Sequence, residues 1–94
     1  MIKVKKNELK NILNKFNNGS IIIVFNCVLN GKIIVNNCIC KYANRSGNIE
    51  IKDNDTKDIF TIDTFLVYKI LRDNHFTILE LYMDYDLKIK ILKV

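Results

Sequence analysis

The sequence has few of the residues from which enzyme active sites and membrane spans are built. There is one histidine, His75, there are two serines, Ser20 and Ser46, and there is no glycine-rich phosphate-binding loop. No set of nucleophile, base and orienting group can be assembled from these residues, so we expect a protein that is not an enzyme. The longest apolar run, Ile21–Phe25, has five residues, whereas a membrane helix needs about 20. No membrane partner is therefore expected.

Cysteine is scarce as well, with Cys27, Cys38 and Cys40 as the three instances. An odd number of cysteines, without the apolar segment of a secretory signal peptide, argues against a disulfide framework and for a cytoplasmic protein. Cys38 and Cys40 have the spacing of a strand, and a fourth zinc ligand would have to be His75. We expect buried, reduced thiols that act as small hydrophobic groups, with no metal and no cofactor.

Proline, glutamine and tryptophan are absent, and Ala43 is the one alanine, whereas isoleucine occurs 16 times and asparagine and lysine 13 times each. These preferences follow AT-rich codons and indicate a low-GC genome: that of a bacterium, its phages or plasmids, or an AT-rich protist. Apolar residues make up 49% and charged residues 27%, which are the values of an ordinary globular domain. Because no linker or repeat divides the chain, we expect one domain over residues 1–94.

The net charge of +5 is unevenly distributed along the chain. Residues 1–47 carry +7, residues 48–86 carry −5 and residues 87–94 carry +3. This asymmetry predicts a surface with basic and acidic regions, suited to oriented docking on a partner. The candidate partner-binding residues are the basic Lys5, Lys6 and Lys10 and the acidic Asp53, Asp55 and Asp58.

The acidic candidates form the pattern Asp53-x-Asp55-x-x-Asp58, which hints at a loop that binds a cation through oxygen ligands. An EF-hand loop needs glycine at its sixth position and glutamate at its twelfth. Here those positions hold Asp58 and Thr64. We therefore interpret residues 53–58 as a solvated acidic turn.

The pattern of residues 8–18 predicts the clearest helix. Leu9, Ile12, Leu13 and Phe16 are spaced i, i+3, i+4 and i+7 and form one apolar stripe. Asn7 is expected as the N-cap, and Gly19 is expected to end the helix. The stripe should pack on a sheet, with Phe16 and Phe25 as core residues that join helix and sheet.

Residues 20–29 and 32–42 predict a β-hairpin, because Asn30-Gly31 lies between two runs rich in β-branched residues. A two-residue turn there would place Ile23 opposite Cys38 and Ile21 opposite Cys40, with Leu29 opposite Lys32. Both faces of this hairpin would be largely apolar, which is more than one short helix can cover. Further strands are expected at residues 2–6, 48–52, 59–63, 76–83 and 87–94, and residues 64–72 suit either a strand or a short helix.

An N-terminal helix, a bent hairpin and the segments Gly47-Asn-Ile-Glu-Ile51 and Phe60–Asp63 resemble a small Sm-like or SH3-like barrel over residues 8–71. The characteristic Sm signature residues are missing, so no RNA pocket is carried over. The expected fold class is α+β, with an N-terminal helix packed on a mostly antiparallel sheet or small barrel of about five to six strands.

In size and AT-rich composition the chain resembles the small anti-defence proteins of phages and plasmids, of which the anti-CRISPR proteins are the best known. That resemblance implies a non-enzymatic protein that inhibits a host nucleic-acid-handling defence complex by stoichiometric binding in the host cytoplasm. The alternative is a small basic module that binds nucleic acid through its lysines. A structural subunit of a homo-oligomer is a third possibility.

Overall fold

The computed structural model describes residues 1–27 and 30–94, and these residues form one α-helix, two short 3-10 helices and nine strands. Six of the strands form one sheet and three form another, and every pairing between neighbouring strands is antiparallel. The bounds of the elements are as follows: β1 (Ile2–Lys3), η1 (Lys6–Glu8), α1 (Leu9–Asn14), β2 (Ile21–Asn26), β3 (Gly31–Val35), β4 (Cys38–Ala43), β5 (Asn48–Asp53), β6 (Ile59–Asp63), η2 (Thr64–Leu66), β7 (Val67–Arg72), β8 (Ile78–Met83) and β9 (Lys88–Lys93).

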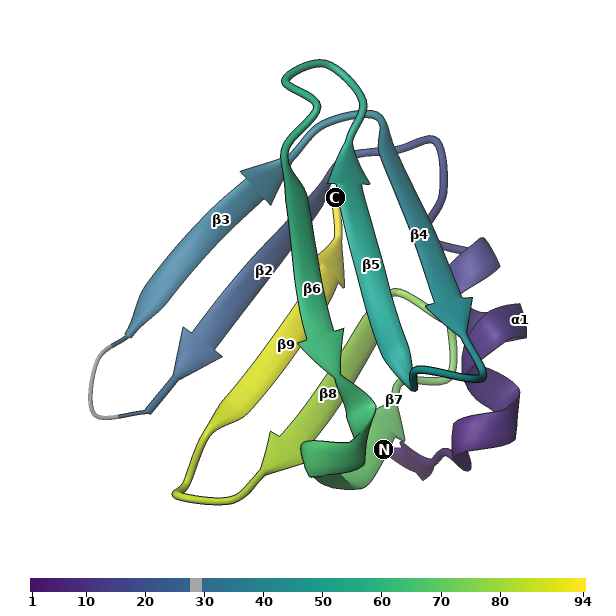
Figure 1. Ribbon diagram of the computed structural model, residues 1–94, viewed down its shortest axis with the longest axis vertical. Coiled ribbons are helices and arrows are strands. Elements are labelled where there is room, and N and C mark those ends of the chain that lie inside the picture. Colours follow the sequence, from purple (N-terminus) through teal and green to yellow (C-terminus); the bar gives the residue numbers. More distant parts are fainter. Residues whose placement is uncertain (28–29) are drawn as a thin grey trace.

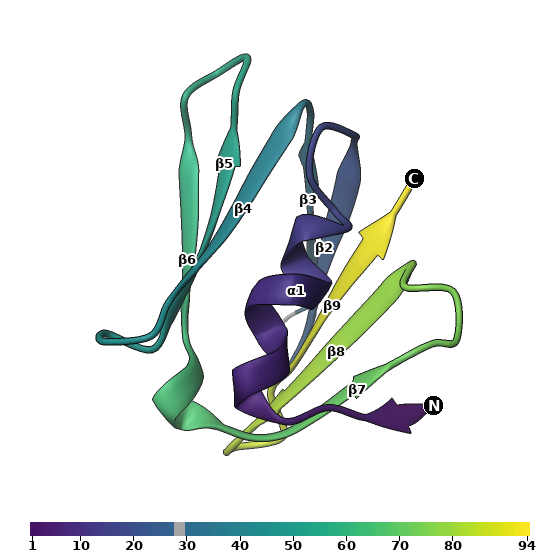
Figure 2. The same cartoon turned by 90° about the vertical axis from the view of Figure 1, so that its right-hand side faces the viewer.

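The two sheets face each other across the core, and α1 lies between them on the side of β4 (Figures 1 and 2). The large sheet has the order β1-β7-β8-β9-β2-β3, and the small one has the order β4-β5-β6. This arrangement confirms a helix with antiparallel sheets. Of the two predicted alternatives, an antiparallel sheet or a small barrel, the barrel is wrong, because the strands are divided between two separate sheets. The predicted number of five to six strands is also wrong, because the described residues form nine.

The predicted strand over residues 32–42 is in fact two strands that belong to different sheets. The break falls at Asn36-Asn37, where Asn37 adopts a left-handed backbone conformation with φ of 47°. The backbone N–H of Asn36 donates to the carboxylate of Asp53, and the Asn37 side chain donates to Asp55 at 2.9 Å. These contacts end β3 and direct the chain into β4.

The predicted hairpin exists, but its predicted register is wrong. β2 and β3 pair with Phe25 opposite Gly31, Ile23 opposite Ile33 and Ile21 opposite Val35. Asn30-Gly31 is therefore not a two-residue turn, because β2 ends at Asn26 and Gly31 already belongs to β3. Lys32 lies opposite Val24 rather than Leu29, and Leu29 itself falls outside the described residues.

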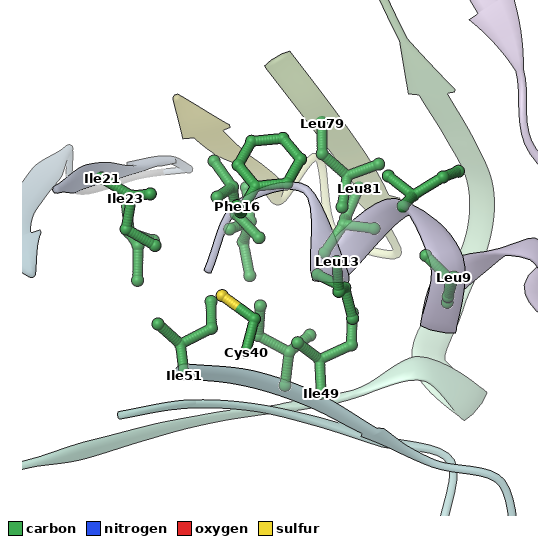
Figure 3. Close-up of a cluster of buried hydrophobic side chains, with 14 of the residues drawn as sticks. Leu9, Leu13, Phe16, Ile21, Ile23, Cys40, Ile49, Ile51, Leu79 and Leu81 are labelled. Carbon is green, nitrogen blue, oxygen red and sulfur yellow. The ribbon is translucent and has the colours of Figure 1, made fainter. Parts of the chain in front are cut away.

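The predicted apolar stripe of the helix is confirmed, since Leu9, Ile12, Leu13 and Phe16 are all buried. Figure 3 shows three of these side chains between Leu79 and Leu81 of the large sheet and the strands of the small one. The helix is shorter than expected because Asn17, Asn18 and Gly19 bond to β4 instead of continuing it. The backbone N–H of Cys38 donates to the carbonyl of Gly19, and the N–H of Asn18 donates to the carbonyl of Cys38. The N–H of Cys40 donates to the side-chain oxygen of Asn17.

The ends of this helix also differ from the expectation. The first helical turn is η1, with Lys5 as its N-cap, so Asn7 lies inside η1 and does not cap it. The left-handed residue after α1 is Asn18, with φ of 69°, rather than Gly19. Asparagine tolerates this conformation because its short amide side chain costs little there.

The remaining strand predictions agree with the structure apart from their ends. β1, β5, β6, β8 and β9 fall within or close to the expected ranges. Residues 64–72 contain both of the alternatives, since the 3-10 helix η2 precedes strand β7. Phe25 is half-buried and packs on Phe60 of the small sheet at a ring-centroid distance of 5.2 Å, so it joins the two sheets rather than helix and sheet.

Candidate functional site

One face of the large sheet is covered by none of the described elements, and we call it the open sheet face. Figure 2 shows α1 and the small sheet together on the other side. Strand alternation sends the residues between the buried ones outward, and the strand registers align them in rows across the sheet. The first row is Ile78, Leu92, Ile22 and Ile34; the second is Lys3, Leu71, Glu80, Lys90, Val24 and Lys32; the third is Lys69, Tyr82, Lys88 and Asn26.

The open sheet face concentrates positive charge. It carries five lysines and one carboxylate, Glu80, and therefore four of the five net positive charges of the chain. The other charged side chains nearly balance, with ten lysines and arginines against nine carboxylates. The open sheet face therefore attracts a polyanion.

Glu80 organises the lysines at the centre of this face. Its carboxylate lies 3.3 Å from the ammonium of Lys88 and 3.4 Å from that of Lys90, and it accepts a hydrogen bond from the Tyr82 hydroxyl at 3.0 Å. Burial alone would raise the pKa of Glu80, but the hydrogen bonds from Tyr82 and Lys88 and the charge of Lys88 lower it. Glu80 is therefore ionised at neutral pH and holds the two lysine side chains along the sheet.

Aromatic rings accompany these lysines. The ammonium groups of Lys69 and Lys88 lie 4.3 Å and 5.1 Å from the centroid of the Tyr82 ring, within the range of cation–π attraction. Tyr68 lies where the pairing of β7 with β8 is irregular, between Val67 and Lys69. The centroid of its ring is 6.5 Å from that of the Tyr82 ring. The Tyr68 side chain is 66% exposed, so much of its ring is accessible to a ligand.

The basic residues singled out from the sequence lie away from this face. All three are exposed. Lys5 lies between β1 and η1, Lys6 lies in η1 and Lys10 lies in α1. The Lys6 ammonium lies 5.8 Å from the centroid of the Phe65 ring. Lys10 borders a shallow depression together with Lys41 and Tyr42.

The acidic residues occupy the opposite end of the molecule, at the turn between β5 and β6 (Figure 1). Asp55 and Asp58 are exposed, but Asp53 is buried. The carboxylate of Asp53 accepts hydrogen bonds from the backbone N–H groups of Thr56, Asn36 and Asp55, and the first two of these hold its pKa below the usual value. Asp53 therefore holds the turn against the β3–β4 crossover and is not available to a partner. The prediction of a fully solvated acidic turn is wrong for this residue.

The cysteines are free thiols, and two of them match the expectation of burial. Cys38 donates a hydrogen bond to the carbonyl of Phe16, and burial next to Cys38 raises the pKa of the Cys40 thiol. Cys27 differs from the expectation, because it is exposed. Within residues 1–27 and 30–94, no three side chains of histidine, cysteine, aspartate or glutamate are grouped closely enough to hold a metal ion.

An apolar groove of about 240 Å³ lies between β3 and the β5–β6 hairpin, at the edges of the two sheets. Exposed isoleucines border it, with Ile33 39%, Ile34 57% and Ile59 58% exposed. Because Ile34 also belongs to the first row of the open sheet face, the groove and that face are continuous.

Comparisons with protein-family models, with curated proteins and with solved structures found no match. Among the helices of the described part of the chain, none has the length and apolar character that a membrane span requires.

The open sheet face was not predicted from the sequence, although part of the signal for it is present in β9. The alternation Lys88-Ile89-Lys90-Ile91 shows that these lysines share one face of a strand. It does not show that Lys3, Lys32 and Lys69 lie on the same face, because that depends on the strand order. Alternation also shows that Glu80 and Tyr82 share one face of β8, because they alternate with the buried Leu79 and Leu81.

Proposed function

We propose that this chain is a non-enzymatic binding protein that inhibits a nucleic-acid-handling complex of the host, a CRISPR-type defence complex, by stoichiometric binding. In this proposal the open sheet face contacts the nucleic acid of the complex. The observation that carries the proposal is the concentration of four of the five net positive charges on one uncovered sheet face. Phosphate groups neutralised by such lysines release counterions, which is the main source of affinity in nucleic-acid binding.

The non-enzymatic part of the proposal is supported by the reactivity of the available groups. The thiolate is the nucleophilic form of cysteine, and burial that raises the pKa of Cys40 disfavours that form. His75 lies in an exposed turn between β7 and β8. Such groups provide binding and packing more readily than nucleophilic catalysis.

The choice of a defence complex is supported by the small size and AT-rich composition of the chain. A protein component beside the nucleic acid is supported by the exposed Ile33, Ile34 and Ile59, because interfaces between proteins bury apolar side chains at their centre. These isoleucines border the groove that continues from the open sheet face.

A second candidate function is a nucleic-acid-binding module that acts on free DNA or RNA. The specific observation in its favour is the exposed Tyr68 ring beside the lysines of the open sheet face. Aromatic rings on a sheet provide stacking platforms for bases and need no protein partner.

Affinity purification from the infected or native host, with both protein and nucleic acid identified, separates the two candidates. A nucleic-acid-handling complex that is recovered at one copy of this chain per complex supports inhibition. Recovery of nucleic acid without associated proteins supports the module instead. Recovery of a protein complex that contains no nucleic acid would contradict the role of the open sheet face.

A salt titration of the purified protein with a labelled oligonucleotide tests the face itself. For single strands the logarithm of the binding constant should fall with the logarithm of the salt concentration, with a slope of about −0.7 per phosphate contact. The triple variant Lys3→Glu, Lys32→Glu, Lys90→Glu should lose binding. The matched control is Lys5→Glu, Lys6→Glu, Lys10→Glu, which changes the net charge equally and should retain most of the binding. Equal losses in the two variants, or no binding at low salt, would contradict the assignment.

A further inference from the structure

The pattern of side chains on the open sheet face distinguishes between forms of nucleic acid. We propose, on the basis of the proposed function, that the open sheet face binds single-stranded nucleic acid and discriminates against the duplex. The argument depends on the order of the three rows, on the exposed tyrosine and on the extent of the face.

The three rows differ in chemistry. The first consists of aliphatic side chains alone, and the second and third contain all the lysines of the face. Alternate residues of one strand are about 7 Å apart, so the aliphatic row runs alongside the lysine rows at that separation. The aliphatic row is accessible, since Ile34 is 57% exposed and Ile22, Ile78 and Leu92 are half-buried.

A duplex is poorly matched to this pattern. Its bases are stacked inside the helix, and its outer surface is a charged, strongly hydrated phosphate backbone. Contact with the lysine rows would bring that backbone against Ile22, Ile34 and their neighbours, and polar groups that lose water without a partner cost free energy. A single strand can instead turn its bases onto the aliphatic row while its phosphates reach the lysines.

Tyr68 provides a further contact that only an unstacked base can make. Its exposed ring stands beside Tyr82, whose own ring is accompanied by the ammonium groups of Lys69 and Lys88. Bases stack on exposed aromatic rings without sequence preference, because every base has a flat π-face. The lysines next to these rings supply positive charge for the flanking phosphates.

The face is wide enough for several nucleotides. Lys3 of β1 and Lys32 of β3 are separated by five strand spacings of about 4.8 Å, which is roughly 24 Å. For comparison, the sites of OB folds, which are small β-barrels that bind single strands, cover about 4 to 16 nucleotides. An oligonucleotide of about 12 nucleotides is long enough to cross the whole face, since a stacked strand rises about 3.4 Å per nucleotide, and we expect one to bind per protein molecule.

The experiment compares labelled oligonucleotides of about 12 nucleotides, as single-stranded DNA, single-stranded RNA and the corresponding duplex DNA. We expect either single strand to bind at least tenfold more tightly than the duplex in the same buffer. The DNA and RNA probes separate the two sources of a single strand, and preference for either one supports the inference.

Two pairs of variants test the contacts. Ile34→Ser should weaken single-strand binding severalfold, and the control Ile39→Ser, at a half-buried residue of β4 in the other sheet, should not. Tyr68→Ala should weaken it about fivefold or more. Its control is Phe65→Ala, since Phe65 is 69% exposed and lies over Gly47, away from the face. Melting temperatures of all four variants establish that they are folded.

The outcomes are distinct. Duplex binding that equals or exceeds single-strand binding would overturn this inference and leave the proposed function standing. Equal effects of each variant and its control would overturn the placement of the strand on the aliphatic row and Tyr68. If no nucleic acid binds at low salt, both the inference and the role of the open sheet face in the proposed function are wrong.

Discussion

At the scale of single residues, two aspartates act as hydrogen-bond acceptors that hold turns in place. Asp53 joins the β5–β6 turn to the crossover at Asn36. Asp73 accepts from the hydroxyl and the N–H of Thr77 and from the N–H of Ile78, and so closes the β7–β8 turn. Their sequence context is that of ordinary solvated turns. The role of Asp53 could not be predicted, because one of its donors, Asn36, is 17 positions away.

Asp73 makes stability depend on pH in the acid range. Burial alone would raise its pKa, but the hydrogen bonds from Thr77 and Ile78 outweigh burial and hold the pKa at about 2. This is below the usual aspartate value of about 3.9, so the unfolded chain takes up the proton first as the pH falls. The stabilisation is complete above about pH 5 and is lost between there and pH 2.

We therefore expect Asp73→Asn to lower the melting temperature by a few degrees at pH 6. The difference from the unmodified protein should shrink as the pH falls toward 2. Thermal melts by circular dichroism at several pH values measure this, with Asp86→Asn in an exposed turn as the control. A difference that stays constant from pH 6 to pH 2 would show that the ionised carboxylate has no part in it.

At the scale of elements, periodicity predicted the helix well and the β2–β4 region poorly. The i, i+3, i+4, i+7 stripe of the helix is a local signal, and all four of its residues are buried. Residues 32–42 are rich in apolar residues on both sides of Asn36-Asn37, so the prediction kept these two asparagines inside one strand and missed the break. That break depends on hydrogen bonds to Asp53 and Asp55, which are distant in sequence.

The helix provides a direct test of this packing. Phe16 is fully buried, between the large sheet and the small one (Figure 3). Phe16→Ala should lower the free energy of unfolding by about 3–5 kcal/mol, because it leaves a cavity where an aromatic ring was packed. Chemical denaturation measures the change. Asn14→Ala, at an exposed position of the same helix, should change stability by about 0.5 kcal/mol or less.

A loss below about 1 kcal/mol for Phe16→Ala would mean that the helical stripe does not pack as described. The comparison with Asn14→Ala excludes a general effect on helix formation, because alanine is the strongest helix former.

At the scale of the whole molecule, the strand order is the feature that the sequence did not disclose. The sequence pattern predicts β1, β2, β8 and β9 as strands, places β3 inside one longer strand and leaves β7 open between strand and helix. It does not indicate that β9 lies between β8 and β2, or that β1 pairs with β7. These pairings join distant parts of the chain. The open sheet face is a product of this order, since it collects lysines from β1, β3, β7 and β9.

Because β9 lies in the middle of the large sheet, we expect its removal to unfold the whole protein. Deletion of Lys88–Val94 removes the partner of both β2 and β8, so we expect loss of the cooperative thermal transition. Deletion of Met1–Lys3 removes only the edge strand β1, which pairs with β7 alone, and should leave a cooperative transition. A cooperative melt of the first variant, measured by circular dichroism, would contradict this role of β9.

The same placement of β9 determines when the protein can fold during its synthesis on the ribosome. Residues 21–26 of β2 are translated early, yet one of their two neighbours, β9, is translated more than 60 residues later. Until then the isoleucine-rich edge of β2 is exposed, and exposed apolar strand edges promote aggregation. Contacts between distant segments also slow folding. Prompt synthesis of β9, or a chaperone that covers β2 until β9 is made, would limit this exposure in the nascent chain.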